Sequence, residues 1–271
     1  MNDTVVKPVV MEVTNSNKEH LKSMEEKPQE YMKELEENEK EENEKQREVW
    51  ERIYKENAEN LELSGGWFIL AGTIIVAIGE SKVFIQDMEE GKNGVVIGSA
   101  VEALGNTLQA IGIAKVYEVE PLPPYLTASA GCWLQAGGNA TNAVATEIEI
   151  QGEEEEGERL NALGSGVQSY GAYIEAVGNR ALPPFIMQET LITGNILIAI
   201  GSALDAIGQI FLLQEKEEAG GLLLVSGAWI QVLGAALEVY AISIHNSVAV
   251  FEERSKEESE RYSYGYAMYQ R

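Results

Sequence analysis

The sequence predicts an all-α protein built from three tandem helical hairpins, and three observations support this fold class. Six glycines recur at separations of 33, 33, 33, 30 and 33 residues. A small residue stands seven positions before and seven after each of them, which is the period of two helical turns. The connections between the repeats alternate between acidic and Pro-Pro segments. The six glycines are Gly72, Gly105, Gly138, Gly171, Gly201 and Gly234.

These six glycines are expected to be helix-packing residues. A glycine inside a helix costs about 1 kcal/mol relative to alanine, so a stripe of glycines needs compensation from packing. Residues without bulky side chains let a second backbone approach closely, as small-residue stripes do between membrane helices. We therefore assign the six glycines to helix–helix contacts. A glycine-lined conduit or ligand groove is the alternative.

Residues 1–62 form a predicted acidic arm ahead of the repeats. Residues 1–17 show no periodic apolar pattern and are expected to be mobile, whereas a helix is expected from Pro28 onward. Residues 36–48 contain no apolar side chain, and Glu–Lys pairs at four-residue spacing support such a helix only weakly. A disordered acidic tail is the alternative. The apolar face expected to dock on the first repeat consists of Val49, Trp50, Ile53, Tyr54 and Leu61.

Residues 63–251 form the predicted repeat array. Acidic connections follow the first, third and fifth repeats, and proline pairs follow the second and fourth. Proline cannot continue a helix and restricts the residue before it, so Pro123-Pro124 and Pro183-Pro184 are breaks between helices. The unit is therefore a hairpin of about 66 residues, present three times, with six helices of about 33 residues each including the connection. The acidic connections are residues 86–91, 151–157 and 214–220.

Residues 252–271 form a charged, tyrosine-rich tail. Four tyrosines crowd into its last ten residues. We expect a frayed terminus packed loosely on the last repeat, with addition to a neighbouring subunit as an exposed strand as the alternative. The tyrosines are Tyr262, Tyr264, Tyr266 and Tyr269.

Each repeat helix has two faces, and the solvent around it is the open question. With the glycine as position zero, positions two, three and six form an apolar arc, and positions one and four carry polar side chains. We predict an amphipathic helix in water and a cytoplasmic protein, since residues 1–20 lack a signal-peptide pattern. Each helix is also long enough to cross a bilayer, so a membrane protein is the alternative. The connections show no usable excess of Lys or Arg that would indicate an orientation.

Position four of the heptad carries the most regular polar set in the sequence. In water, the interpretation we favour, these side chains form the solvent-facing side of each helix. In lipid, Glu175, Asp205 and Glu238 would instead face inward and act as ion or proton sites. The set consists of Glu102, Gln109, Gln135, Asn142, Gln168, Glu175, Asp205, Gln231 and Glu238.

Three tryptophans lie beside the stripe of small residues. Trp67, Trp133 and Trp229 each lie five residues before a central glycine, and interdigitated packing is their expected role. Cys132 lies between Gly131 and Trp133 and is expected to be a packed thiol rather than a nucleophile.

No reaction centre is predicted. The net charge of −24 excludes a nucleic-acid backbone as partner and disfavours an anionic membrane surface. One cysteine excludes an internal disulfide and a cysteine metal cluster, and His20 and His245 have no Cys or His at ligand spacing. There is no phosphate-binding loop with its Lys-Ser/Thr. We therefore predict a protein that is not an enzyme and has no cofactor, metal or identified small-molecule substrate.

Three repeat phrases resemble a family defined by such repeats. Gly-Asn-Thr-Leu-Gln-Ala-Ile-Gly (105–112), Gly-Ser-Ala-Leu-Asp-Ala-Ile-Gly (201–208) and Gly-Ala-Trp-Ile-Gln-Val-Leu-Gly (227–234) are similar to uncharacterised Gly/Ala-rich repetitive proteins of spore-forming bacteria. The resemblance covers about residues 64–245 and implies a bacterial source and no known activity.

The predicted function is a non-enzymatic structural protein that self-assembles. A repeat array exposes apolar faces at its ends unless these are capped, so we expect a homo-oligomer formed through those ends. The alternative is a polytopic or peripheral helical membrane protein whose polar heptad residues line a path.

Overall fold

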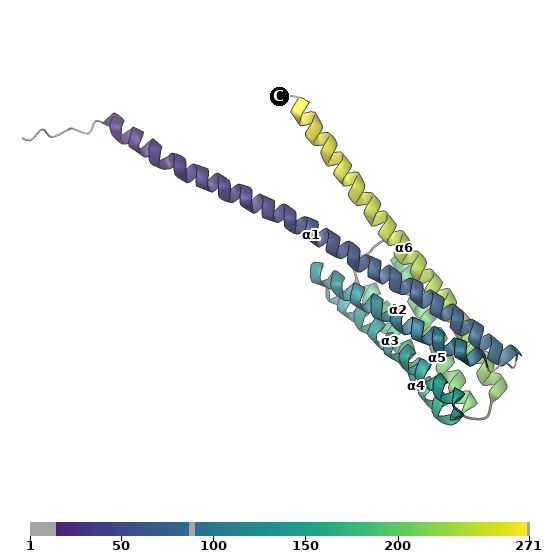
Figure 1. Cartoon of the computed structure of the whole chain (residues 1–271). Coiled ribbons are helices and arrows are strands. Elements are labelled where there is room, and N and C mark those ends of the chain that lie inside the picture. The colour runs from purple at the N-terminus through teal and green to yellow at the C-terminus, as the bar shows by residue number, and fades with distance from the viewer. Residues whose placement is uncertain (1–14, 87–89, 270–271) are drawn as a thin grey trace, which may run out of the picture. The chain divides into compact units, whose positions relative to one another are not determined.

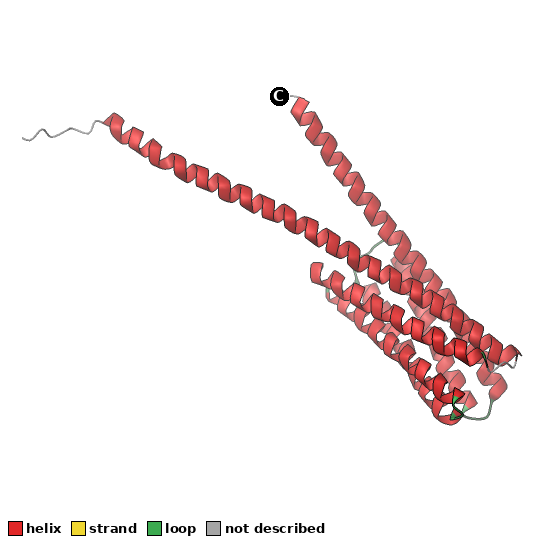
Figure 2. Ribbon diagram, viewed as in Figure 1, coloured by secondary structure: helices red, strands yellow, loops and turns green. Residues whose placement is uncertain are grey.

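The computed structural model describes residues 15–86 and 90–269, which form six α-helices and short connections (Figures 1 and 2). The predicted all-α fold of consecutive helical hairpins is confirmed, and the described residues contain no strand. Most of the segment expected to be mobile, residues 1–17, lies outside the described residues. The helices are α1 (Asn15–Gln86), α2 (Gly91–Val119), α3 (Pro123–Ile150), α4 (Glu154–Ala181), α5 (Gln188–Leu212) and α6 (Glu217–Tyr269).

The chain divides into two compact units, residues 1–53 and residues 54–271. In the first unit α1 already begins at Asn15, so the predicted helix start at Pro28 is wrong. Residues 36–50 are exposed, and a Lys45–Glu41 ion pair of 2.8 Å illustrates their four-residue charge spacing. Val49, Trp50 and Ile53 were expected to dock on the first repeat, but they are 46%, 57% and 60% exposed.

Helices α1 and α6 both continue past the predicted domain boundaries. No proline or glycine interrupts residues 29–64, so α1 runs without a break from the arm into the first repeat. Helix α6 likewise extends to Tyr269, and the strand considered for the tyrosine-rich tail is a helix instead.

The connections give the six-helix bundle two different ends. Pro123 opens the first turn of α3, where its missing N–H is not needed, and Pro183-Pro184 lie between α4 and α5. The first turn of α4 carries Glu154, Glu155 and Glu156, whose charges complement the positive end of the helix dipole. We call the end that holds residues 120–122 and 182–187 the proline end, and the end that holds residues 151–153 and 213–216 the acidic end.

Within each hairpin the two backbones touch at the glycines. A Cβ atom placed on Gly138 of α3 would lie 2.6 Å from the carbonyl oxygen of Gly164 in α4. A Cβ on Gly171 would lie 2.7 Å from the carbonyl oxygen of Gly131. Such distances leave no space for any side chain, so only glycine permits this spacing. The same contact is made by Gly72 and Gly105 between α1 and α2, and by Gly201 and Gly234 between α5 and α6.

The three hairpins close into a ring instead of forming an open array. Serine hydroxyls donate to backbone carbonyls between α2 and α3 (Ser129 to Ala110, 2.9 Å) and between α4 and α5 (Ser169 to Ala199, 2.8 Å). The last helix then meets the first, since Trp229 Nε1 of α6 donates to Ser81 Oγ of α1 at 3.2 Å. The expected apolar faces at open array ends are therefore absent from this bundle.

The glycine contacts predict opposite effects for two adjacent substitutions. Gly138→Ala should lower the free energy of unfolding by about 1–3 kcal/mol, because its methyl group would push α3 and α4 apart. A Cβ on Gly137 meets nothing within 4 Å. Gly137→Ala should therefore raise stability by up to about 1 kcal/mol through helix propensity. Thermal unfolding followed by circular dichroism measures both, and equal effects would contradict the close backbone contact.

Candidate functional site: a polar interior

The polar arc of each helix faces the inside of the bundle. Positions one and four of the heptads are mostly buried, and the large side chains of positions two and six are mostly exposed. Of the nine position-four residues, eight are at most 9% exposed and Asp205 is half-buried. The prediction that position four faces solvent is therefore wrong. Position four lies one turn from the packing glycine on the same helix face, so it is carried inward with that glycine.

The tryptophans beside the glycine stripe point outward. Trp67, Trp133 and Trp229 are 55%, 50% and 45% exposed. Their expected interdigitated packing is wrong, because position two lies on the outer face of each helix. Cys132, by contrast, is fully buried against Ala110 and Ala128, as expected of a packed thiol.

One layer of the interior joins four helices through direct side-chain hydrogen bonds. Gln168 of α4 donates to Glu102 of α2 at 3.3 Å and to the side-chain oxygen of Gln231 of α6 at 2.9 Å. Gln231 donates in turn to Asp205 of α5 at 2.5 Å and accepts from Ser202 at 3.1 Å. We call Glu102, Gln168, Gln231 and Asp205 the central layer.

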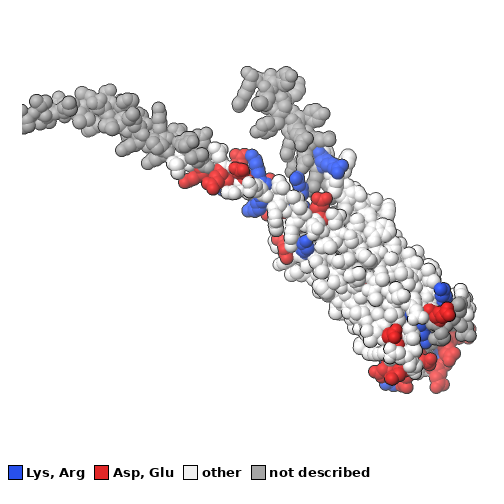
Figure 3. All heavy atoms as spheres, viewed as in Figure 1, with Lys and Arg blue, Asp and Glu red and all other residues white. Residues whose placement is uncertain are grey.

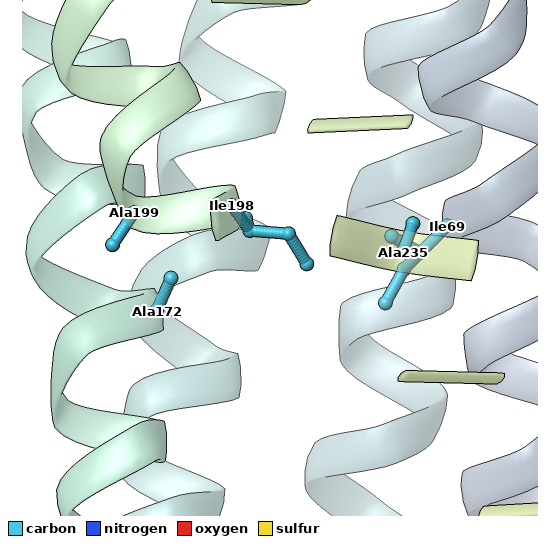
Figure 4. Close-up of a cluster of buried hydrophobic side chains, with 5 residues drawn as sticks. All are labelled: Ile69, Ala172, Ile198, Ala199 and Ala235. Carbon is cyan, nitrogen blue, oxygen red and sulfur yellow. The ribbon is translucent and has the colours of Figure 1, made fainter. Parts of the chain in front are cut away.

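The next layer toward the proline end is partly polar and partly apolar. Gln135 donates to Glu175 at 2.5 Å, and Gln109 donates through Nε2 to Glu238. Ile69 and Ile198 occupy position four on α1 and α5, and they pack with Ala172, Ala199 and Ala235 (Figure 4). Four helices thus present amide or carboxyl groups at this level, and two present isoleucine.

A cavity opens at each end of this interior. The cavity at the proline end has a volume of about 250 Å³, and Glu62, Tyr125 and His245 are among its lining residues. The cavity at the acidic end has a volume of about 510 Å³, and Glu80 and Glu149 line it. The two cavities place carboxyl groups at both mouths of the polar interior.

Several buried polar atoms of the interior have no hydrogen-bond partner within the described part of the chain. Gln109 and Asn195 are each 1% exposed, yet Gln109 Oε1 and both side-chain polar atoms of Asn195 are unpaired. An unpaired buried polar atom costs about 1–3 kcal/mol, so such atoms call for water or a ligand. Most of these atoms are oxygens, namely Asn106 Oδ1, Gln109 Oε1, Asn142 Oδ1, Asn195 Oδ1, Asp205 Oδ1 and Gln209 Oε1.

The outer surface of the bundle has the opposite character. Figure 3 shows an uncharged surface along the bundle on the face in view, with Lys, Arg, Asp and Glu gathered toward its ends. By length and composition, four helical stretches among the described residues can cross a membrane. They are residues 36–86, 91–119, 188–212 and 217–248.

Comparison with known proteins places the chain in a family. Residues 60–239 match the family of unknown function DUF6944. The chain belongs to DUF6944. No curated protein and no solved structure matches the chain. The matched range includes all six packing glycines and every residue of the central layer, so the polar interior lies within the part that defines the family.

The sequence pattern places the polar residues of positions one and four on one helix face of the DUF6944 bundle, and the structure identifies three asparagines at position one as fully enclosed members of the interior. Asn106, Asn139 and Asn195 are each 1% exposed and lie directly after glycines. Their place beside the packing glycine was the signal that could have identified them. In the described part of the chain, no three His, Cys, Asp or Glu side chains are grouped so that they could hold a metal ion.

Glu149, in the last turn of α3, lines the cavity at the acidic end. Burial raises the pKa of Glu149, and the opposing influences are a 2.6 Å hydrogen bond from Asn161 and Lys92, whose Nζ lies 3.7 Å away. Burial and the neighbouring Glu149 and Glu154 also raise the pKa of Glu158. These groups crowd negative charge at the mouth of the acidic-end cavity.

The raised pKa of Glu149 predicts a pH-dependent effect of Glu149→Gln. The folded protein binds this proton more tightly than the unfolded chain, so the stabilisation is present below the unfolded pKa and is lost as pH rises through the folded pKa. Glu149→Gln should match the natural protein near pH 4 and become more stable than it as pH rises toward 8. Thermal midpoints across this range measure the difference. The exposed Glu156→Gln is the matched control, and an equal trend in both variants would contradict the role of burial.

Proposed function

We propose that this DUF6944 chain is a non-enzymatic integral membrane protein whose six helices cross the bilayer and enclose a polar path between the two end cavities. The observation that carries the proposal is the inverted polarity of the bundle. The glutamine, asparagine and glutamate side chains at heptad positions one and four are mostly buried, while the large apolar side chains at positions two and six are mostly exposed. Contiguous exposed apolar surface of this kind is typical of a face that contacts lipid or another protein.

The uncharged surface has the length that a bilayer requires. On α4, the exposed charges Arg159 and Arg180 are 21 residues apart, and the exposed residues between them are Leu163, Gly166, Tyr170, Tyr173 and Val177. At a rise of about 1.5 Å per residue this interval is about 31 Å. The hydrocarbon core of a bilayer is about 30 Å thick, so the two arginines would reach its opposite surfaces.

Helices α3 and α4 fit this proposal although their composition alone does not mark them as spans. Gln135 and Asn139 of α3, and Ser165 and Gln168 of α4, are all at most 4% exposed. Hydropathy averages every face of a helix, so these inward polar side chains lower the value without contacting lipid. Away from the helix ends, between residues 126 and 144 of α3 and between Arg159 and Arg180 of α4, the exposed residues are apolar.

Lysine substitutions at outward-facing leucines test whether lipid or water surrounds the bundle. Leu104 and Leu233 are 48% and 61% exposed. In lipid, Leu104→Lys or Leu233→Lys near the helix centre should cost about 2.5–3.5 kcal/mol of insertion free energy and reduce membrane yield. In water, both changes would be nearly neutral. Ile186→Lys, at an exposed position of the proline end, is the control and should be tolerated.

The same preparations measure membrane association directly. The natural chain should sediment with membranes, resist carbonate extraction and float with lipid vesicles. Recovery in the soluble fraction without detergent, together with full tolerance of the two outward lysines, would overturn the proposal.

Grouping the charges by bundle end predicts an orientation that the connections alone do not indicate. Tyr54 and Asn246 lie at the proline end of the bundle, and the parts of the sequence before Tyr54 and after Asn246 carry most of the 20 Lys and Arg residues. Of the Lys and Arg residues between Tyr54 and Asn246, Lys82, Lys92, Arg159 and Lys216 lie near the acidic end. Cytoplasmic segments of membrane proteins carry the excess of Lys and Arg, so the proline end should be cytoplasmic.

Single-cysteine labelling checks this orientation. Cys132 is the only cysteine and is replaced by alanine. Gln214→Cys then reports the acidic end and Ile186→Cys the proline end. An impermeant maleimide applied to intact cells should label Gln214→Cys alone, and both variants should react after lysis. The reverse labelling pattern would show the opposite orientation.

Self-association is the second candidate function, because exposed apolar side chains would also be buried against another copy in water. Closure of the ring removes the open array ends on which that prediction was based. A soluble, monodisperse oligomer would favour self-association over the membrane function.

A further inference from the structure

We propose that the polar interior carries protons between its two end cavities, relayed by the carboxyl groups of Glu238, Glu102 and Asp205. This inference rests on the membrane-spanning function proposed above and names what would move along its path. Ionisable side chains at membrane depth usually face a bundle interior and mark ion or proton pathways.

Carboxyl groups occur at every level of the interior. Glu62 lines the cavity at the proline end, and Glu80 lines the cavity at the acidic end. Between them lie the layer with Glu238 and the central layer with Glu102 and Asp205. Successive levels are one heptad apart, which is about 10 Å along a helix. Water molecules between the levels are therefore required to connect one carboxyl group with the next.

The unpaired acceptor oxygens point independently to a proton or a proton-donating water. The amide of Gln109 is 1% exposed and is held against Glu238 by its own Nε2 donor. Its Oε1 atom therefore lies in the same carboxyl layer and has no donor. Asp205 Oδ1 is likewise unpaired in the central layer. Such oxygens are satisfied by a protonated carboxyl group, a hydronium ion or water, each of which brings an O–H donor.

The geometry favours protons over larger cations. Direct bonds of 3.3, 2.9 and 2.5 Å join Glu102, Gln168, Gln231 and Asp205 across the bundle, and no hydrated ion fits between groups in direct contact. The carboxyl groups are also spread along the axis. Within the described residues they form no cluster of three that could hold a metal ion.

Each transfer step balances without any other reagent than water. The O–H bond of a protonated carboxyl group breaks as an O–H bond forms on a water molecule, which leaves a carboxylate and a hydronium ion. The hydronium ion then gives one proton to the carboxylate of the next level. Water is regenerated, and one proton has moved one level along the axis.

Proton flux into vesicles tests the inference on the full chain. Purified protein is reconstituted into vesicles that contain a pH-sensitive dye, and a potassium gradient with valinomycin drives proton entry. We expect acidification above that of empty vesicles, reduced at least tenfold by Asp205→Asn and by Glu238→Gln. Glu102→Gln replaces either variant if one fails to insert. The exposed Glu156→Gln is the control and should keep the full rate.

Flotation of the same vesicles separates the two proposals. Protein that floats with the vesicles but gives no flux above empty vesicles overturns the proton inference and leaves the membrane function standing. Protein that does not float overturns the membrane function itself. Flux that needs Na⁺ and stops in choline buffer, or flux unchanged by all the interior variants, also overturns the proton relay.

Discussion

The close approach of two backbones at the glycines of each hairpin is the constraint on which the rest of the bundle depends. Gly138 and Gly164 leave no space for a Cβ atom between α3 and α4, and equivalent pairs fix the other hairpins. Residues at positions one and four share the helix face of the glycine, so they are carried into the interior with it. Large side chains at positions two and six have no room there and point outward. The glycine stripe therefore decides which arc of every helix is buried.

A polar helix face can be buried without a large loss of stability only where its polar groups form hydrogen bonds. Closure of the ring supplies many of these hydrogen-bond partners. Gln109 of α2 bonds Glu238 of α6, and Gln168 of α4 bonds Gln231 of α6, so these partners come from helices that are not neighbours in the ring. Buried amides without partners would destabilise the fold, since each costs about 1–3 kcal/mol. An open array of hairpins would keep such helices apart. The interior network and the contact of α6 with α1 are thus parts of one arrangement.

The sequence predicted the six repeat helices and the connections between them, because periodicity and proline act locally, but it did not predict how far α1 and α6 extend beyond the repeats. It also identified the polar residues that form the interior, but it predicted that these residues face solvent. The assignments of Gly138 to packing and of Asn142 to solvent were incompatible, because residues four apart are neighbours on a helix surface. A helical wheel separates two faces without saying which solvent each one meets. Closure of the ring depends on contacts such as Trp229 with Ser81, which are 148 residues apart and leave no local pattern.

The three hairpins repeat in sequence, yet the interior they enclose is not threefold. Ile69 and Ile198 stand where the other helices place glutamine or glutamate, so polar groups at that level come from α2, α3, α4 and α6. Helices α3 and α4 are also the two that composition does not mark as membrane spans. Each alone would expose its amides to lipid at a cost of several kcal/mol per unsatisfied group. When α3 and α4 pack glycine against glycine and are flanked by α2 and α5, their exposed residues away from the helix ends are apolar. On the proposed function, α3 and α4 are therefore stable in a bilayer only as part of the closed ring.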